Sequence, residues 1–435
     1  MRLVLRAFLP ACILLVFAGC SVQGGDSLLS PPNLPSEYVE LEKQLNAILD
    51  SGARYITPET GAERQSVQLI DLNADGKNEA VAFFMMGDGA LRAYFFEYGS
   101  DGYREAGFVE GIGARRLYSV DYIEFDGSTK RAIALSWTYD ETQNRGLVIS
   151  GYETGGVYDL LRTQYRGILY ADGNHDGDLE IFTATVNDVT GAYRARVFEL
   201  DGGEYQQAAE IPMCAEVRDV RSMVLGEGNG GETLIYIDSA AHGSGYVTDV
   251  ISWLPQPDNL SMDGIIGSGS STLRQASVFC RDIDNDGKIE VPMVEKIGSG
   301  RIDWYRYGGQ KEQAAETYYS AADSWYMHWP ESWQDEVSSQ RTAGDGVIMT
   351  TFYVPVTAGG MNEVRNALLT VYVFGGENSS ETLQSYSGVR QLRVVGNTVY
   401  AYSMLPNDFP QYALNDADMV RLFGIIEVTD SGEGY

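Results

Sequence analysis

The strongest constraint on the fold of this chain is an acidic nine-residue pattern that occurs three times, each time directly before an apolar run. The copies cover residues 71–79, 172–180 and 282–290, and all three read D-x-[DN]-x-D-G-x-x-E. Roughly a hundred residues separate each copy from the next, and self-similarity at a regular spacing is typical of repeat architectures. We therefore expect a chain built from repeated units, each with a tight acidic turn.

Degenerate copies lie midway between the intact ones, at 121–127 and 226–232, and each again leads into an apolar run. An aromatic run that ends in glycine follows each intact loop, at 94–99, 197–202 and 304–308. The unit is therefore a series of strands and turns over roughly fifty residues, close to the size of a β-propeller blade. The 49 glycines and 28 tyrosines also favour β structure, because glycine supplies turns and tyrosine fills half-buried strands.

Two further units are expected around the apolar runs 347–354 and 392–404, with 422–428 as the strand that closes the ring. Dividing the repeat region into seven units of about fifty residues accounts for its whole length. The sequence thus predicts an all-β fold, a β-propeller of seven blades over residues 52–435. A linear solenoid is the alternative, although its repeats are usually shorter and more uniform.

The acidic loops offer the oxygen ligands that a hard cation needs. Side chains at positions one, three, five and nine, with the backbone carbonyl at position seven, would converge because glycine at position six permits the bend. Oxygen ligands favour Ca²⁺ over zinc or copper. An EF-hand would need an acidic residue at position twelve, where Ala82, Thr183 and Met293 stand instead. The predicted ligands are Asp71, Asn73, Asp75, Lys77 (carbonyl), Glu79, Asp172, Asn174, Asp176, Asp178 (carbonyl), Glu180, Asp282, Asp284, Asp286, Lys288 (carbonyl) and Glu290. The alternative is that Asp, Asn and Gly form these turns without any metal.

The three intact loops resemble the FG-GAP or VCBS-type repeat, which occurs in the calcium-bearing blades of the integrin α-subunit propeller and in many bacterial surface proteins. The resemblance implies a bacterial calcium-binding β-propeller with up to three structural Ca²⁺ ions. The degenerate loops lack enough ligands, so we expect them to be free of metal.

The N-terminus has the pattern of a bacterial lipoprotein. Arg2 and Arg6 precede an apolar run at 8–17 that is too short to span a membrane and fits the core of a signal peptide. The segment that ends at Cys20 resembles the lipobox, in which the cysteine becomes lipidated. The expected segments are a signal peptide at 1–19, the lipidation site Cys20, a flexible tether at 20–35 and an amphipathic helix at 36–51. The protein would then be anchored by lipid to the extracytoplasmic face of the cell membrane. An ordinary secretory signal is the alternative.

The formal net charge of −30 argues against nucleic acid as a partner, because phosphate binding needs a basic face. An aromatic segment is the candidate ligand-binding surface, with core packing as the alternative. Its residues are Tyr318, Trp325, Tyr326, Trp329 and Trp333. Cys214 and Cys280 are expected to be buried thiols, with a disulfide as the alternative.

Known catalytic motifs are not recovered. The glycine-rich run at 226–231 fits a dinucleotide fingerprint by letter, but an expected strand follows it where a helix is needed. The three histidines are far apart in the sequence, so they do not suggest a zinc hydrolase. We expect a binding or scaffold module for protein or glycan and assign no catalytic residue. A polysaccharide lyase or hydrolase that uses a propeller cleft is the alternative, and a structural partner in an envelope complex is a third hypothesis.

Overall fold

The computed structural model describes residues 36–426, apart from short segments at 125–128, 229–230, 255–260, 268, 295–298, 308–310, 334–335, 345, 359–361 and 407. The predicted signal peptide, Cys20 and the tether lie outside these residues. Within the described part of the chain, no helix has both the length and the apolar character that a membrane span requires.

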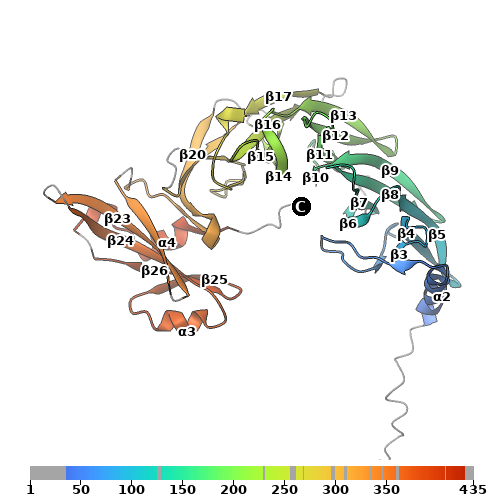
Figure 1. Ribbon diagram of the computed structural model, residues 1–435, viewed down its shortest axis with the longest axis horizontal. Helices are drawn as coiled ribbons and strands as arrows, with labels where there is room; N and C mark the ends of the chain where they lie inside the picture. The colour runs from blue at the N-terminus through green and yellow to red at the C-terminus, as the bar shows by residue number, and fades with distance from the viewer. Residues whose placement is uncertain are drawn as a thin grey trace, which may run out of the picture.

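The described residues form six antiparallel sheets that follow one another along the chain and are arranged in an open arc (Figure 1). In the second, third and fourth sheets the strands follow chain order, with the first strand on the concave side of the arc and the last on the convex side (Figure 1). This succession of small meander sheets around a centre is the blade arrangement of a β-propeller.

The first three sheets contain thirteen of the strands. The first sheet consists of β1 (Arg54–Tyr55), β2 (Val67–Ile70), β3 (Glu79–Met85), β4 (Leu91–Gly99) and β5 (Gly102–Gly111). The second consists of β6 (Arg116–Glu124), β7 (Arg131–Thr138), β8 (Arg145–Glu153) and β9 (Gly156–Tyr165). The third consists of β10 (Gly167–Ala171), β11 (Glu180–Val186), β12 (Tyr193–Asp201) and β13 (Glu204–Pro212).

The last three sheets contain the remaining strands. The fourth consists of β14 (Val217–Glu227), β15 (Thr233–Ala241), β16 (Tyr246–Leu254) and β17 (Ser261–Gly267). The fifth consists of β18 (Val291–Met293), β19 (Arg301–Arg306), β20 (Glu312–Ser320), β21 (Trp325–His328) and β27 (Phe423–Ile425). The sixth consists of β22 (Ser338–Gly344), β23 (Val347–Ala358), β24 (Asn362–Phe374), β26 (Thr398–Met404) and β25 (Arg390–Val395).

The hydrophobic core lies between successive sheets. Phe83 and Phe95 of the first sheet share one buried cluster with Leu135 and Trp137 of the second, and similar clusters join each later sheet to its neighbour. Every residue of β11 and of β15 is buried, which requires cover on both faces of the sheet. Face-to-face packing of sheets therefore holds the arc together.

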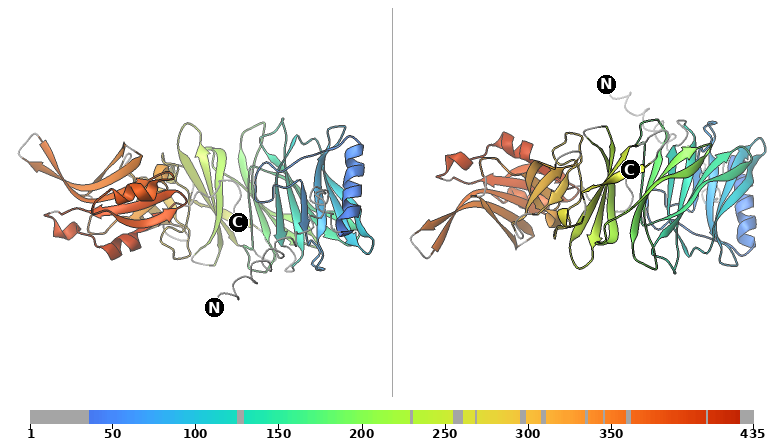
Figure 2. Two further views of the ribbon diagram at one scale, coloured as in Figure 1. Left: turned by 90° about the horizontal axis from the view of Figure 1, so that it is seen from below. Right: turned by 90° about the horizontal axis from the view of Figure 1, so that it is seen from above.

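Helices cover the outer faces of the two end sheets. Helix α2 (Ser36–Asp50), where the sequence predicted a helix at 36–51, packs Leu41 and Leu45 on the outer face of the first sheet. Helix α3 (Ser379–Gln384) brings Leu383 against the outer face of the sixth sheet. The two helices lie toward opposite ends of the molecule (Figure 2). Each end face thus has a helix in the position that a neighbouring blade occupies elsewhere.

Two details of the predicted topology are wrong. The runs 347–354 and 392–404, predicted as separate blades, pair with β24 in one sheet. The predicted closing strand at 422–428 begins at the end of α4 (Asp416–Leu422), and its strand β27 pairs with β21 of the fifth sheet. The described residues therefore form six blades without ring closure, so the predicted count of seven is not confirmed.

Candidate metal-binding loops

The three acidic loops occupy the same place in alternate sheets. The loop at 71–79 joins β2 to β3, and the loop at 172–180 joins β10 to β11. The loop at 282–290 leads into β18, where an isolated bridge between Arg281 and Glu290 takes the place of a first strand. Of the degenerate copies at 121–127 and 226–232, the described residues 121–124 and 226–227 form the ends of β6 and β14, the first strands of the second and fourth sheets. The repeat predicted from the sequence is therefore present as a repeat of structure.

All three loops have the same backbone conformation at positions four and six. The fourth residue, which is Ala74, His175 or Asn285, has a φ of 60°, 62° and 61° respectively. The sixth residue is glycine in each loop, with φ between 83° and 97°. Both angles lie in the left-handed region, which glycine enters at no steric cost. Two such residues in one short turn explain why the chain reverses tightly enough to face its carboxylates inward.

Backbone amides hold the first carboxylate of each loop inward. In the first loop the Asp71 carboxylate accepts from the N–H groups of Asp75 and Gly76 at 3.2 and 2.9 Å. The equivalent bonds to Asp172 are 3.2 Å each, and those to Asp282 are 3.1 and 2.8 Å. The carboxylate at position five in turn accepts from the N–H at position seven, as Asp75 does from Lys77 at 2.9 Å. The predicted ligands at positions one and five are therefore brought together in all three loops.

The seventh residues, Asp178 and Lys288, donate their N–H groups in the same way, at 2.9 and 3.0 Å. At position three, Asn73 and Asn174 accept from the N–H at position five at 3.0 and 2.9 Å. These contacts place the predicted ligands around one turn, as the sequence pattern requires.

The glutamate at position nine is buried at the start of the second strand. Glu79 accepts from the Leu72 N–H at 2.9 Å, and Glu180 accepts from the Gly173 N–H at 2.7 Å. Burial raises the pKa of Glu79 to about 7, with a further contribution from the charges of Asp75 and Asp71. Burial likewise raises the pKa of Glu180 to about 8. Carboxylates in such an environment favour either a proton or a cation, and a hard divalent cation would stabilise their ionised form.

The third loop differs because an arginine lies among its carboxylates. Arg306 of β19 donates from Nε to Glu290 at 2.8 Å, and its Nη2 lies 2.7 Å from both Asp284 and Asp286. Burial raises the pKa of Glu290, whereas the bonds from Arg306 act in the opposite direction. Carboxylate oxygens of Asp282, Asp284 and Glu290 lie within 4.8 Å of one another. This loop therefore has its ligands close together but shares three of its four carboxylates with a guanidinium group.

The predicted aromatic site is in the core. Trp325 and Trp333 are fully buried, Trp329 and Tyr318 are less than 9% exposed, and Tyr326 is half-buried. These four buried rings belong to the cluster between the fifth and sixth sheets. Trp325 and Tyr326 lie on strand β21, which pairs with β20 and β27. The geometry favours the packing interpretation of this segment.

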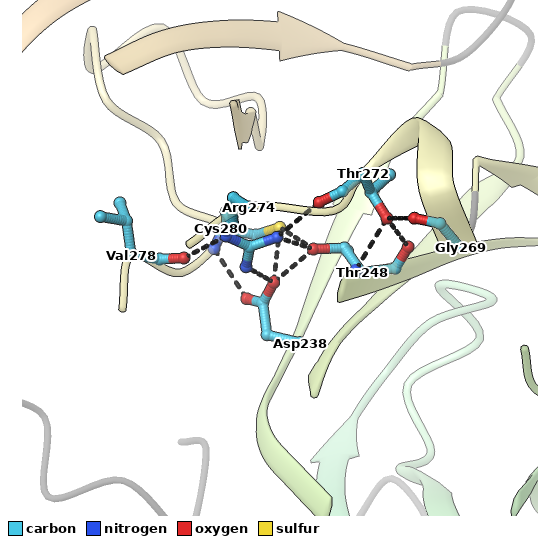
Figure 3. Close-up of polar contacts among 7 residues, drawn as sticks. All are labelled: Asp238, Thr248, Gly269, Thr272, Arg274, Val278 and Cys280. Atoms are coloured by element: carbon cyan, nitrogen blue, oxygen red, sulfur yellow. Dashed lines mark hydrogen bonds and ion pairs between the residues drawn. The ribbon is translucent and has the colours of Figure 1, made fainter. Parts of the chain in front are cut away.

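A buried polar network in the fourth sheet was not predicted (Figure 3). Arg274 donates from Nη2 to Asp238 at 2.6 Å, and both side chains are at most 1% exposed. Arg274 also donates from Nε to the Val278 carbonyl and from Nη1 to Thr248, at 2.6 and 2.9 Å. The N–H of Cys280 donates to Asp238 at 2.7 Å. This network attaches the segment after β17 to the middle of the sheet, and no local sequence pattern marks its members.

The cysteines among the described residues, Cys214 and Cys280, form no disulfide with each other. Cys280 is buried, as expected from the sequence, whereas Cys214 is half-buried.

No family model matches this sequence, and no curated protein matches it. Among solved structures, the chain is similar to the beta-propeller domain of the trilobed protease from Pyrococcus furiosus, at 12% identity and a TM-score of 0.29, over 71% of this chain and 89% of that one. It is also similar to a triple arginine-to-alanine mutant of AofleA from Arthrobotrys oligospora, at 11% identity and a TM-score of 0.28, over 72% of this chain and 88% of that one. TM-scores this low carry no argument about a site or a function.

Proposed function

We propose that this protein is a lipid-anchored, extracytoplasmic, calcium-binding β-propeller that acts as a binding or scaffold module for protein or glycan. The observation that carries the proposal is the shared geometry of the three acidic loops. In each loop, the carboxylates at positions one and five lie in the same tight turn. Three copies of an oxygen-rich turn, each next to a buried glutamate, suit a hard cation better than a turn whose only purpose is chain reversal.

The role of calcium in this proposal is structural. The loops at 71–79 and 172–180 precede strands inside their sheets, and the loop at 282–290 precedes β18 at the edge of the fifth sheet. A cation that bridges a loop to the glutamate at position nine would fix the start of the strand that follows. Calcium bound only by the folded state stabilises that state by mass action. The chain would then present a rigid arc whose outer loops contact a partner, as propellers commonly do.

Calorimetric titration of the protein with Ca²⁺ after removal of metal by chelation tests the calcium proposal. We expect binding with a rise in melting temperature that a chelator reverses. Asp75→Ala and Asp176→Ala should each remove about one binding site. Asp101→Ala, which removes an exposed carboxylate from the turn between β4 and β5, is the matched control and should leave the titration unchanged. Absence of any heat or thermal shift at millimolar Ca²⁺ would reject the calcium assignment.

The lipid anchor is supported by the arginine-flanked apolar run that ends at Cys20. Membrane fractionation of cells that express the full chain tests it independently of calcium. The wild type should pellet with membranes, and detergent should release it.

A further inference from the structure

The three loops differ in the residue that the neighbouring strand places beside their buried glutamate. In the first sheet Ala80 pairs with Phe96, so the residues beside that pair are Glu79 and Glu97. The same register in the third sheet brings Glu199 beside Glu180, and in the fifth sheet it brings Arg306 beside Glu290. The position next to the buried glutamate therefore carries an acid in two sheets and a base in the third.

This difference changes the charge that a cation would meet. Around the second loop, Oε1 of Glu199 is buried without a hydrogen-bond partner. Around the first loop, Glu97 is 8% exposed and pairs with Arg104 of β5 at 2.6 Å. Both loops thus retain carboxylates that gain from a divalent cation.

The third loop already has a cation bound among its ligands. The Arg306 guanidinium lies 2.7 to 2.8 Å from oxygens of Asp284, Asp286 and Glu290, which stand at ligand positions three, five and nine. Arginine keeps its charge at any physiological pH, and its planar fork suits several carboxylates at once. A Ca²⁺ ion at this loop would have to displace that group and leave it near a divalent charge. Arg306 binds Oδ2 of Asp284, whereas Oδ1 of the same carboxylate is buried without a hydrogen-bond partner.

We propose that Arg306 replaces calcium in the third loop, so that the protein binds two Ca²⁺ ions, at 71–79 and 172–180, and closes the loop at 282–290 with its own guanidinium group. The inference rests on the proposed calcium binding for the first two loops. It departs from the sequence pattern, which assigns the same ligand set to all three.

The test measures bound calcium per chain, by elemental analysis after gel filtration at a fixed free Ca²⁺ concentration, in the wild type and in Arg306→Gln. The wild type should hold two ions, and the variant three, because glutamine leaves the carboxylates without a positive charge. Arg92→Gln is the matched control, since Arg92 pairs with Glu110 at 2.8 Å and its side chain is 25% exposed, close to the 27% of Arg306. This control should still hold two ions.

Thermal melting in excess chelator gives a second measurement. Metal-free Arg306→Gln should melt below metal-free wild type, because three carboxylates lose their counter-charge, and Ca²⁺ should restore more of the loss than it does for Arg92→Gln. In the wild-type background, Asp286→Ala should leave the count at two, whereas Asp75→Ala should lower it to one. This pair keeps the inference testable even where Arg306→Gln does not fold.

The outcomes separate the two proposals. Three ions in the wild type, or an unchanged count in Arg306→Gln, would overturn the role of Arg306. No ion in the wild type but one in Arg306→Gln would support the role of Arg306 while rejecting calcium at the first two loops. No ion in either protein would reject the calcium proposal and this inference with it.

Discussion

Removal of the buried Arg274 charge should destabilise the protein more than any loss of a surface ion pair. Arg274 and Asp238 are at most 1% exposed and lie 2.6 Å apart, so their charges are screened by neither water nor salt. In Arg274→Met the Asp238 carboxylate stays buried without its counter-ion. Breaking a buried pair from one side costs about 3–5 kcal/mol, most of it from the uncompensated charge. The carbonyl of Val278 also loses its donor.

Urea denaturation followed by tryptophan fluorescence measures this cost, and Trp253 of β16 lies in the same sheet as the network. With an m-value of about 3 kcal/mol/M, the loss should lower the midpoint by at least about 1 M while m stays unchanged. Arg115→Met is the control, because the Arg115–Asp140 pair has a similar length of 2.8 Å but both side chains are more than two-thirds exposed. That variant should lose less than about 1 kcal/mol.

A double variant tests the reasoning behind the magnitude. In Arg274→Met with Asp238→Asn, the asparagine oxygen can accept from the Cys280 N–H and its amide can donate to Thr248, so no buried charge remains. The double variant should therefore be more stable than Arg274→Met alone, with a coupling energy of about 1–3 kcal/mol. A midpoint shift for Arg274→Met as small as that of Arg115→Met, or strictly additive losses in the double variant, would refute the argument.

Three further outcomes are expected. Cys20→Ala should move the protein from the membrane fraction to the soluble fraction, and unchanged pelleting would remove the lipoprotein assignment. Trp333→Ala should lower the free energy of unfolding by about 3–5 kcal/mol, because the fully buried ring packs between two sheets and donates to the Tyr412 carbonyl at 2.9 Å. A loss under about 1 kcal/mol in denaturation would contradict the core assignment. Burial alone would raise the pKa of Asp323, but hydrogen bonds from Arg341 at 2.8 Å and from Ser320 lower it below its ordinary value. The ionised Asp323 should therefore contribute to folding stability above the ordinary aspartate pKa of 3.8, and this contribution should be lost as the pH drops below that value. Asp323→Asn should remove that part of the acid transition in pH-dependent melting.

Local signals in the sequence were enough to predict the loops and the strands that follow them. Gly76, Gly177 and Gly287 mark turns that need a positive φ, and the apolar residues after each acidic loop form buried strands. Helix α2 was predictable for the same reason, since Leu41 and Leu45 lie one turn apart on its buried face. In each case the information lies within about ten residues.

The blade count and the closing strand depended on pairing between distant segments, which local patterns do not encode. Strand β27 pairs through Phe423, Gly424 and Ile425 with β21, almost a hundred residues earlier. The segment 375–389, with helix α3 inside it, joins β24 to β25 within one sheet, whereas the runs 347–354 and 392–404 were predicted as separate blades. Strand propensity alone does not distinguish these arrangements, because both bury the same apolar residues.

The arginine at position 306, where two other repeats have a glutamate, can be found in the sequence when the aromatic runs are aligned by their pairing register. Glu97, Glu199 and Arg306 follow an aromatic residue at the same place in three repeats, but the D-x-[DN]-x-D-G-x-x-E pattern ends before that strand begins. A motif defined along the chain therefore misses a neighbour that is contributed by the adjacent strand. Such neighbours decide whether a ligand set is open to a cation or already neutralised.

The capped ends of the arc determine how far the loss of one loop can spread. In a closed ring each blade contacts two others, so damage to one blade weakens the whole circle. Here α2 and α3 cover the outer faces of the first and sixth sheets, and each inner sheet packs mainly on its immediate neighbours. The stability of such a stack is close to a sum of terms for each unit and each interface between neighbours. Opening of the loop at 71–79 should therefore loosen the first sheet and its contact with the second, while the network around Arg274 in the fourth sheet stays intact. On this reasoning each acidic loop, whether held by a metal or by Arg306, stabilises one blade and its nearest interfaces.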